Sequence, residues 1–143
     1  MSTFRADTTA NLLTVLNAYV TANPTLLKRA YKARPASSPD VPFAYIDGRS
    51  ETIRFDQGTQ NRVLSGLSFV VVDKISDNGE TADRLDTLVD GLVSHLAGYP
   101  QLGATYGVWS QLNVTDEDWP FGDYDFAAVR FAFPDISLME GRT

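Results

Sequence analysis

The sequence contains no cysteine and only one histidine, His95. Without cysteine the chain can form neither disulfides nor thiolate zinc sites, and it offers no cysteine nucleophile. One histidine excludes metal sites built from several imidazoles. Apolar runs approaching the ~20 residues that span a bilayer are also lacking, so we expect no membrane contact. Residues 1–7 have no signal-peptide apolar core, and we expect an intracellular product.

Basic residues are scarcer than acidic ones: 12 Lys and Arg face 18 Asp and Glu, which gives a formal net charge of −6. General binding to nucleic acid needs a surplus of basic residues on some face, so the charge disfavours it. A chain of 143 residues can bury roughly 68–70% of its unfolded surface in a single core. We therefore expect one domain, residues 1–143, whose aperiodic end, 135–143, is a mobile tail.

Motifs with catalytic or phosphate-binding spacing are missing too, including the nucleophile elbow and the glycine-rich loops. An acidic stretch runs from Asp116 to Asp125 and holds five carboxylates. Pro120 stands where an EF-hand loop requires an acid or Asn, so a solvated hairpin loop is favoured over a calcium site. His95 is interpreted as a solvated or capping residue near a helix C-terminus. We expect no catalytic residue, cofactor or metal.

A buried strand followed by an amphipathic helix dominates what is present. From Leu67 to Asp73 apolar residues fall on both faces, which indicates a central strand covered on each side. The helix that follows has one apolar stripe, and Gly98 and Pro100 end it. Gly91 inside this helix predicts close packing against a strand. The stripe consists of Leu85, Leu88, Val89, Leu92 and Leu96.

A first helix is expected to begin at Asp7 or Thr8 and to end at Asn23, because the residue before a proline disfavours helix. The segment Lys28–Arg34 carries four of the twelve basic residues. We interpret it as a solvated edge strand whose charges discourage pairing, or as a contact for an acidic partner surface.

The remaining strands follow from alternation of apolar and polar residues. Residues 43–46 and 52–55 read as a hairpin, residues 106–114 as a strand, and Asp125–Phe133 as a last strand closed by Pro134. We predict an α+β fold in which a mostly antiparallel sheet of about four to five strands packs against two main helices.

Particular strings give a resemblance to a known family. The basic stretch Lys28–Pro35, the strand Phe69–Asp73 and the segment Asp77–Asp86, which reads DNGETADRLD, resemble the tail terminator (tail completion) proteins of long-tailed double-stranded DNA bacteriophages, especially actinobacteriophages. The similarity extends from about Thr8 to Phe133.

The resemblance implies a non-enzymatic virion protein of the tail and neck, assembled in the host cytoplasm. Such proteins form a ring, usually of six subunits, on the last ring of the tail tube. The implied partners are further copies, the tail tube protein, the head-completion or connector protein, and the tape measure protein as an additional possibility. DNA would pass through the ring without sequence-specific contact.

Interface residues cannot be transferred from the family, so we choose them from expected exposure. They lie at two strand tips, at one tryptophan, in the acidic loop and in the C-terminal tail. They are Gly48, Arg49, Ser50, Gln57, Gly58, Thr59, Trp109, Trp119, Phe121, Ile136, Leu138 and Met139.

Two alternatives stay open. One is a head-completion or neck adaptor protein of the same particle. The other is a small α+β barrel enzyme or ligand-binding protein, in which His95 or the carboxylates from Asp116 to Asp125 act on a small molecule.

Overall fold

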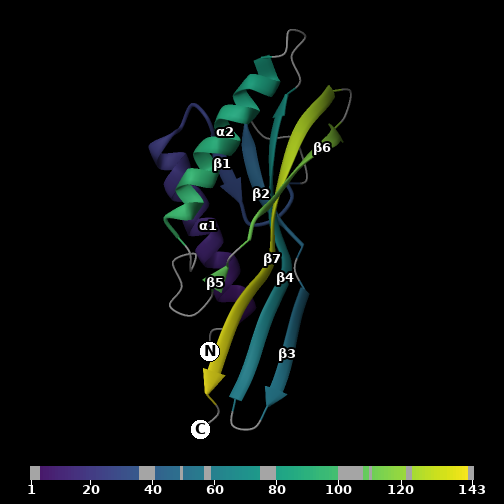
Figure 1. Ribbon diagram of the computed structural model, residues 1–143. Helices are drawn as coiled ribbons and strands as arrows, with labels where there is room; N and C mark the ends of the chain where they lie inside the picture. The colour runs from purple at the N-terminus through teal and green to yellow at the C-terminus, as the bar shows by residue number, and fades with distance from the viewer. Residues whose placement is uncertain are drawn as a thin grey trace.

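The computed structural model describes residues 4–35, 41–48, 50–56, 59–74, 80–99, 108–109, 111–121 and 124–141. Two helices lie on one face of a mostly antiparallel sheet (Figure 1). The α+β class is therefore confirmed. In the described part of the chain the sheet has seven strands: five follow one another along its main path, and two more pair beside them.

Both helices use an apolar stripe to cover the sheet. Helix α1 (Phe4–Ala22) and helix α2 (Glu80–Ala97) alternate buried apolar with exposed polar positions at helical spacing. Helix α1 begins before Asp7 and ends as predicted, since the Asn23 amide donates to the Tyr19 carbonyl ahead of Pro24. The stripe residues are Leu12, Val15, Leu16 and Tyr19 on α1, and Leu85, Leu88, Leu92 and Leu96 on α2.

Two long strands form the middle of the sheet. Strand β4 (Thr59–Lys74) pairs antiparallel with β7 (Tyr124–Gly141) in a single register. Strands β2 (Phe43–Asp47) and β3 (Ser50–Asp56) follow one another along the other edge of β4. The predicted β2–β3 hairpin is therefore wrong: both strands pair with β4, which is long enough to take them in succession.

The shorter strands complete the sheet. Strand β1 (Arg29–Tyr31) pairs parallel with β2, and β5 (Val108–Trp109) and β6 (Asn113–Phe121) both pair with β7. The acidic stretch is thus not a hairpin loop, because its residues 116–121 belong to β6. Likewise Pro134 does not close the last strand, and residues 135–141 continue β7 instead of forming an irregular tail.

The core lies on both faces of β4, as the apolar run from Leu67 predicted. Phe69 and Val71 face the helices, while Val70 and Val72 belong to a second cluster with Phe43 on the opposite face. Phe69 stacks on Phe131 with ring centroids 4.6 Å apart. Because alternate residues serve two separate clusters, a slip of one residue in β4 would exchange their environments.

Candidate interface surfaces

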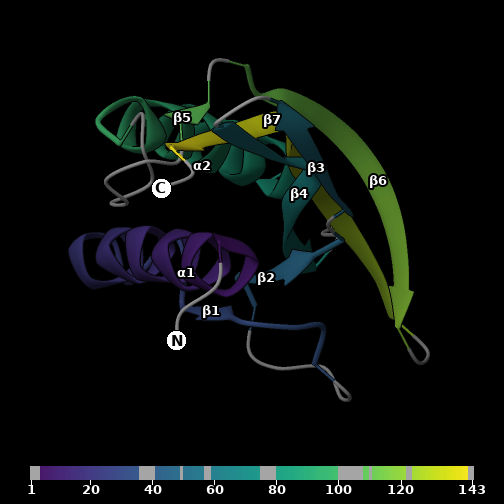
Figure 2. The same ribbon diagram turned by 90° about the horizontal axis from the view of Figure 1, so that it is seen from below.

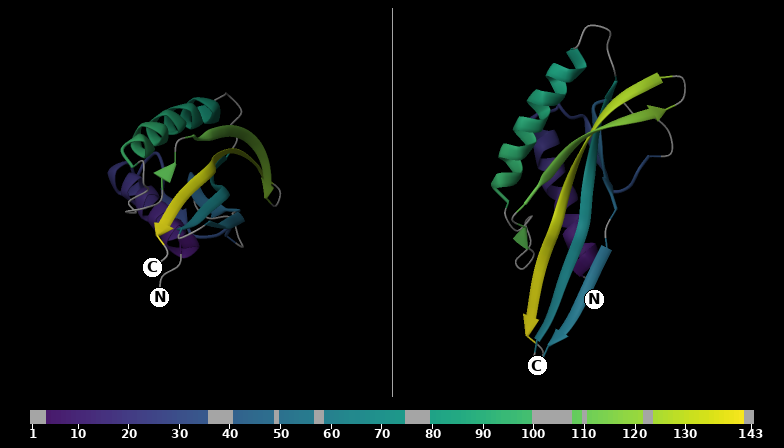
Figure 3. Two further views of the ribbon diagram at one scale, coloured as in Figure 1. Left: turned by 60° about the horizontal axis from the view of Figure 1, so that its bottom comes forward. Right: turned by 45° about the vertical axis from the view of Figure 1, so that its right-hand side comes forward.

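Part of the sheet extends beyond the helices. We call it the arm: β3, Thr59–Ser65 of β4, and Asp135–Gly141 of β7. Figures 1 and 3 show these three strands projecting past the ends of α1 and α2. The rest of the molecule, with both helices, β1, β2, β5, β6 and the remaining parts of β4 and β7, is called the body. A three-stranded projection of this kind presents two faces and one long edge to a partner.

Exposed apolar side chains gather on β3 of the arm. Ile53 is 40% exposed and Phe55 is 61% exposed. In the ladder Ile53 is opposite Arg62, which is in turn opposite Leu138 of β7. Large apolar side chains that remain in water on a projecting strand are a feature of protein contact surfaces. Interface residues were predicted at the ends of β3 but not at these two positions, because alternation alone does not say which face is left uncovered.

Two glycines mark the boundary between arm and body. Gly48 follows β2 with φ of 63°, and Gly66 within β4 has φ of 69°, a region that side chains disfavour. A Cβ placed on Gly48 would lie 3.6 Å from the Gly66 carbonyl oxygen, so the two backbone turns are neighbours. Opposite them, the register of β4 and β7 passes from Ser65–Asp135 to Leu67–Phe133. Pro134, which has no amide proton to donate, occupies the skipped position.

An ionic cluster on β7 ties β6 to β2 and β4. Arg130 of β7 forms ion pairs with Glu117 of β6 and, at 2.9 Å, with Asp47 of β2. It also donates to the Ser68 hydroxyl at 2.8 Å. The hydrogen bond that Arg130 donates to Glu117, followed by the one it donates to Asp47, raises the pKa of the Arg130 guanidinium despite its partial burial. The cluster therefore joins four strands, and Glu117 is engaged within the chain.

Polar contacts also fix the two helices. The buried carboxylate of Asp73 accepts from Arg84 Nε at 2.9 Å, which joins the end of β4 to α2. His95 Nε2 lies 2.8 Å from the Val15 carbonyl oxygen, and its ring lies edge-on to Tyr19. His95 is half-buried between the helices, so its interpretation as a solvated or capping residue is wrong.

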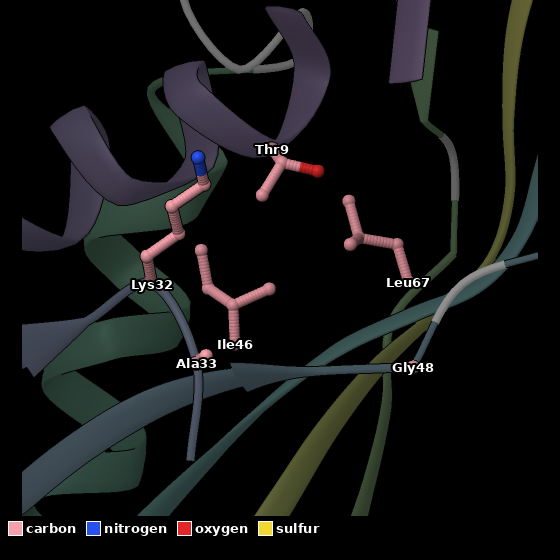
Figure 4. A pocket seen from close by; sticks show the side chains of 6 residues that line it. All are labelled: Thr9, Lys32, Ala33, Ile46, Gly48 and Leu67. Carbon is pink, nitrogen blue, oxygen red and sulfur yellow. The ribbon is translucent and has the colours of Figure 1, made fainter. Parts of the chain in front are cut away.

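A pocket lies between the first turns of α1 and the sheet. Its volume is about 330 Å³, and it is lined by Thr9, Lys32, Ala33, Ile46, Gly48 and Leu67. Figure 4 shows that Lys32 comes from the end of β1, while Ile46 and Leu67 project from the sheet toward α1. The lining is mainly apolar with a single cation, which offers no pair of groups arranged for acid–base chemistry.

The residues predicted at interfaces are scattered over the molecule. Gly48 is exposed at the boundary of the arm, Ser50 begins β3, and Thr59 begins β4 at the far end of the arm. Trp119 and Phe121 lie on β6, and Leu138 and Met139 on the arm portion of β7. Arg49, Gln57 and Gly58 lie outside the described residues.

Among these residues, Ile136 is not exposed and Trp109 is only half-exposed. Ile136, at the end of the arm that adjoins the body, is fully buried and packs in the core that faces the helices. Trp109 is half-buried, contacts Phe133 at 5.1 Å between ring centroids, and donates its indole N–H to the Tyr99 carbonyl at 2.8 Å. Both side chains therefore contribute to the fold of the chain itself. Alternation placed Trp109 on the outer face, because the strand was taken to be longer than β5.

Within the described residues, no three His, Cys, Asp or Glu side chains come together as a metal site. Neither α1 nor α2, the two helices in that part of the chain, is long and apolar enough to cross a membrane.

The fold has a counterpart among solved structures. No protein-family model and no curated protein sequence matches the chain. A chain from the "Virion of native gene transfer agent (GTA) particle" is similar, with a TM-score of 0.57 and 13% sequence identity. The alignment covers 92% of this chain and 94% of that chain. At this identity the likeness concerns the fold alone, and it extends over nearly the full length of both chains.

Proposed function

We propose that this chain is a structural virion protein, a tail terminator, that forms a ring on the head-proximal end of a phage tail tube. The ring, of six subunits by the resemblance, ends polymerisation of the tube and joins the tail to the head-completion or connector protein. The observation that carries the proposal is the fold likeness over 92% of the chain to a protein of a gene transfer agent virion. The sequence strings that resemble tail terminators support it independently.

The arm supplies the contact with the tube. Its outer end is formed by Asp56, Thr59 and Gly141, and exposed Ile53 and Phe55 lie close to that end in the ladder. An apolar strand surface on a projection can insert against a neighbouring ring, whereas the body remains available for contacts within its own ring. The acidic overall charge suits a ring through which DNA passes without being held.

Two polar groups that could have served an enzyme are occupied by structural contacts. Glu117 is paired with Arg130, and His95 contacts the Val15 carbonyl. A general acid or base has to reach its substrate from a firm scaffold and a cleft, and neither group is presented to the 330 Å³ pocket.

The test is a mass measurement followed by imaging. The purified chain is analysed by light scattering alone and then mixed with the tail tube protein of the same particle, and the mixture is imaged by negative stain. Rings on one end of tubes of arrested length are the expected result. Uncapped tubes, together with binding to the connector protein, would replace the proposal by the neck adaptor. A compact species that binds neither protein but binds a small molecule would replace it by the small α+β barrel enzyme or ligand-binding protein.

A further inference from the structure

Opposite charges occupy two distant edges of the sheet. The segment Lys28–Arg34, which contains β1, holds four basic residues and no acidic one. Strand β6 holds Asp116, Glu117 and Asp118 and no basic residue. We call these the basic edge and the acidic edge. The whole chain has a net charge of −6. The basic edge contributes +4, so the rest of the chain carries −10. The basic edge is therefore a positively charged segment on an acidic molecule.

The two edges face away from each other. Among the described strands, β1 pairs with β2 alone and β6 with β7 alone, and the order β1-β2-β4-β7 separates them. Figure 2 shows β1 beside α1 on one side of the molecule and β6 curving along the opposite side. Lys28, Arg29 and Lys32 are exposed at the first edge, and Asp116 is exposed at the second. The two edges are therefore too far apart to neutralise each other within one chain.

We propose that the basic edge of one copy of this chain docks on the acidic edge of the next copy. This inference rests on the ring put forward above and names the contact that builds it. Opposite charges attract across such a contact, while two basic edges or two acidic edges repel. The same charges thus disfavour two-fold dimers and favour head-to-tail association, which yields a ring when the rotation between copies closes.

The strands themselves contribute to the contact. Edge strands carry backbone N–H and C=O groups that can extend the sheet into a neighbour. Val114 of β6 is 42% exposed and lies two residues from Asp116, so an apolar contact is available next to the charge. Glu117 remains committed to Arg130, which holds β6 in place without a partner.

Charge reversal tests the contact. Lys28→Glu with Lys32→Glu reverses the basic edge, and Asp116→Lys with Asp118→Lys reverses the acidic edge. Each pair is expected to raise the concentration for half-assembly at least tenfold, measured by sedimentation velocity of the purified chain. A chain carrying all four substitutions restores opposite charges and should return to within about threefold of wild type. Asp86→Lys with Asp90→Lys, at exposed positions of α2, is the matched control and should leave assembly unchanged.

Circular dichroism and thermal unfolding establish that each variant is folded. Wild-type assembly should also weaken as salt rises, because screening shortens the reach of exposed charges. If neither charge reversal affects assembly, the proposed contact between edges is wrong. Tube capping by the wild type would then still support the proposed function. Loss of assembly in the four-substitution chain would overturn it as well. A wild type that neither assembles nor caps tubes would remove the proposed function itself.

Discussion

Gly66 of β4 lies opposite Pro134 of β7, at the position where the ladder between these strands is skipped although the register on both sides is the same. The glycine has φ of 69°, and the proline lacks an amide proton. The paired strands therefore cross from body to arm through a local break in their hydrogen bonding, without an inserted residue.

Gly66→Ala is expected to destabilise the protein by about 1–2 kcal/mol, the cost of the left-handed conformation for a residue with a Cβ. No atom lies within 4 Å of the position that the Cβ would take, so the cost comes from the backbone. Gly66→Asn should cost less, since Asn tolerates this conformation. Urea unfolding measures both variants. Equal losses for Ala and Asn would contradict the conformational explanation.

Gly91→Ala should also destabilise, although alanine is the better helix former by about 1 kcal/mol. A Cβ at Gly91 would lie 3.3 Å from Cζ of Tyr19 and closer still to its hydroxyl. The close approach predicted for Gly91 thus exists, but the neighbour is α1 rather than a strand. Tyr19→Phe removes the hydroxyl, so Gly91→Ala should cost less in that background. A double-mutant cycle in urea checks this, and additive losses would refute it.

Arg130→Met should reduce the free energy of unfolding by about 1–3 kcal/mol, because it removes charged hydrogen bonds among β2, β4, β6 and β7. Arg29→Met is the control: Arg29 is exposed and lies 5.0 Å over the Tyr31 ring, so its loss should stay below about 1 kcal/mol. Similar losses for the two arginines, measured by urea unfolding, would argue against the cluster as the link to β6.

Alkaline pH should weaken the fold through two tyrosines. Burial raises the pKa of Tyr19 above 10.0, and burial followed by the charge of Asp47 raises the pKa of Tyr45. The folded state then holds these protons more tightly than the unfolded chain. Their contribution is complete below pH 10 and is lost as pH rises through the folded pKa values.

The measurement compares urea midpoints at about pH 9 and about pH 11. Tyr19→Phe combined with Tyr45→Phe should lose less stability over this interval than the wild type does. Identical pH dependence in both proteins would assign alkaline unfolding to other groups.

Ile53→Gln with Phe55→Gln should leave the free energy of unfolding within about 0.5 kcal/mol of wild type, as for other exposed positions. Under the proposed function, capping of tubes should fall at least tenfold, as counted in negative-stain images. Val93→Gln on α2, where the valine is 41% exposed, is the control for loss of a surface apolar group. Full capping by the double variant would exclude β3 from the tube contact.

The sequence was informative where one physical pattern dominated. The stripe from Leu85 to Leu96 predicted α2, and apolar residues on both faces of the run from Leu67 to Asp73 predicted a central strand. The basic segment after Leu27 was predicted as an edge strand, and β1 lies at the edge of the sheet.

Elsewhere tertiary pairing overrode local propensity. Asp, Glu and Pro are depleted in strands, so Asp116 to Pro120 were predicted as a loop. In the structure these residues form a strand because they pair with the long edge of β7, and Arg130 forms an ion pair with Glu117. Pro134 was predicted to end the last strand. It occupies the one unpaired position between β4 and β7, so the strand continues past it. The exposure of Phe55 and the burial of Ile136 depend on which part of the sheet the helices cover, which no local pattern encodes. The proposed tube contact therefore uses Ile53 and Phe55, whose exposure is visible only in the fold.

Strands β4 and β7 continue from the body into the arm without changing register. The arm is therefore a direct extension of the two strands that form the centre of the core. A force applied at its tip along the strands loads the long antiparallel ladder in shear, so many hydrogen bonds resist together instead of opening one after another. A force that a partner exerts on the arm is therefore transmitted along β4 and β7 to Phe69 and Phe131, which stack in the centre of the protein.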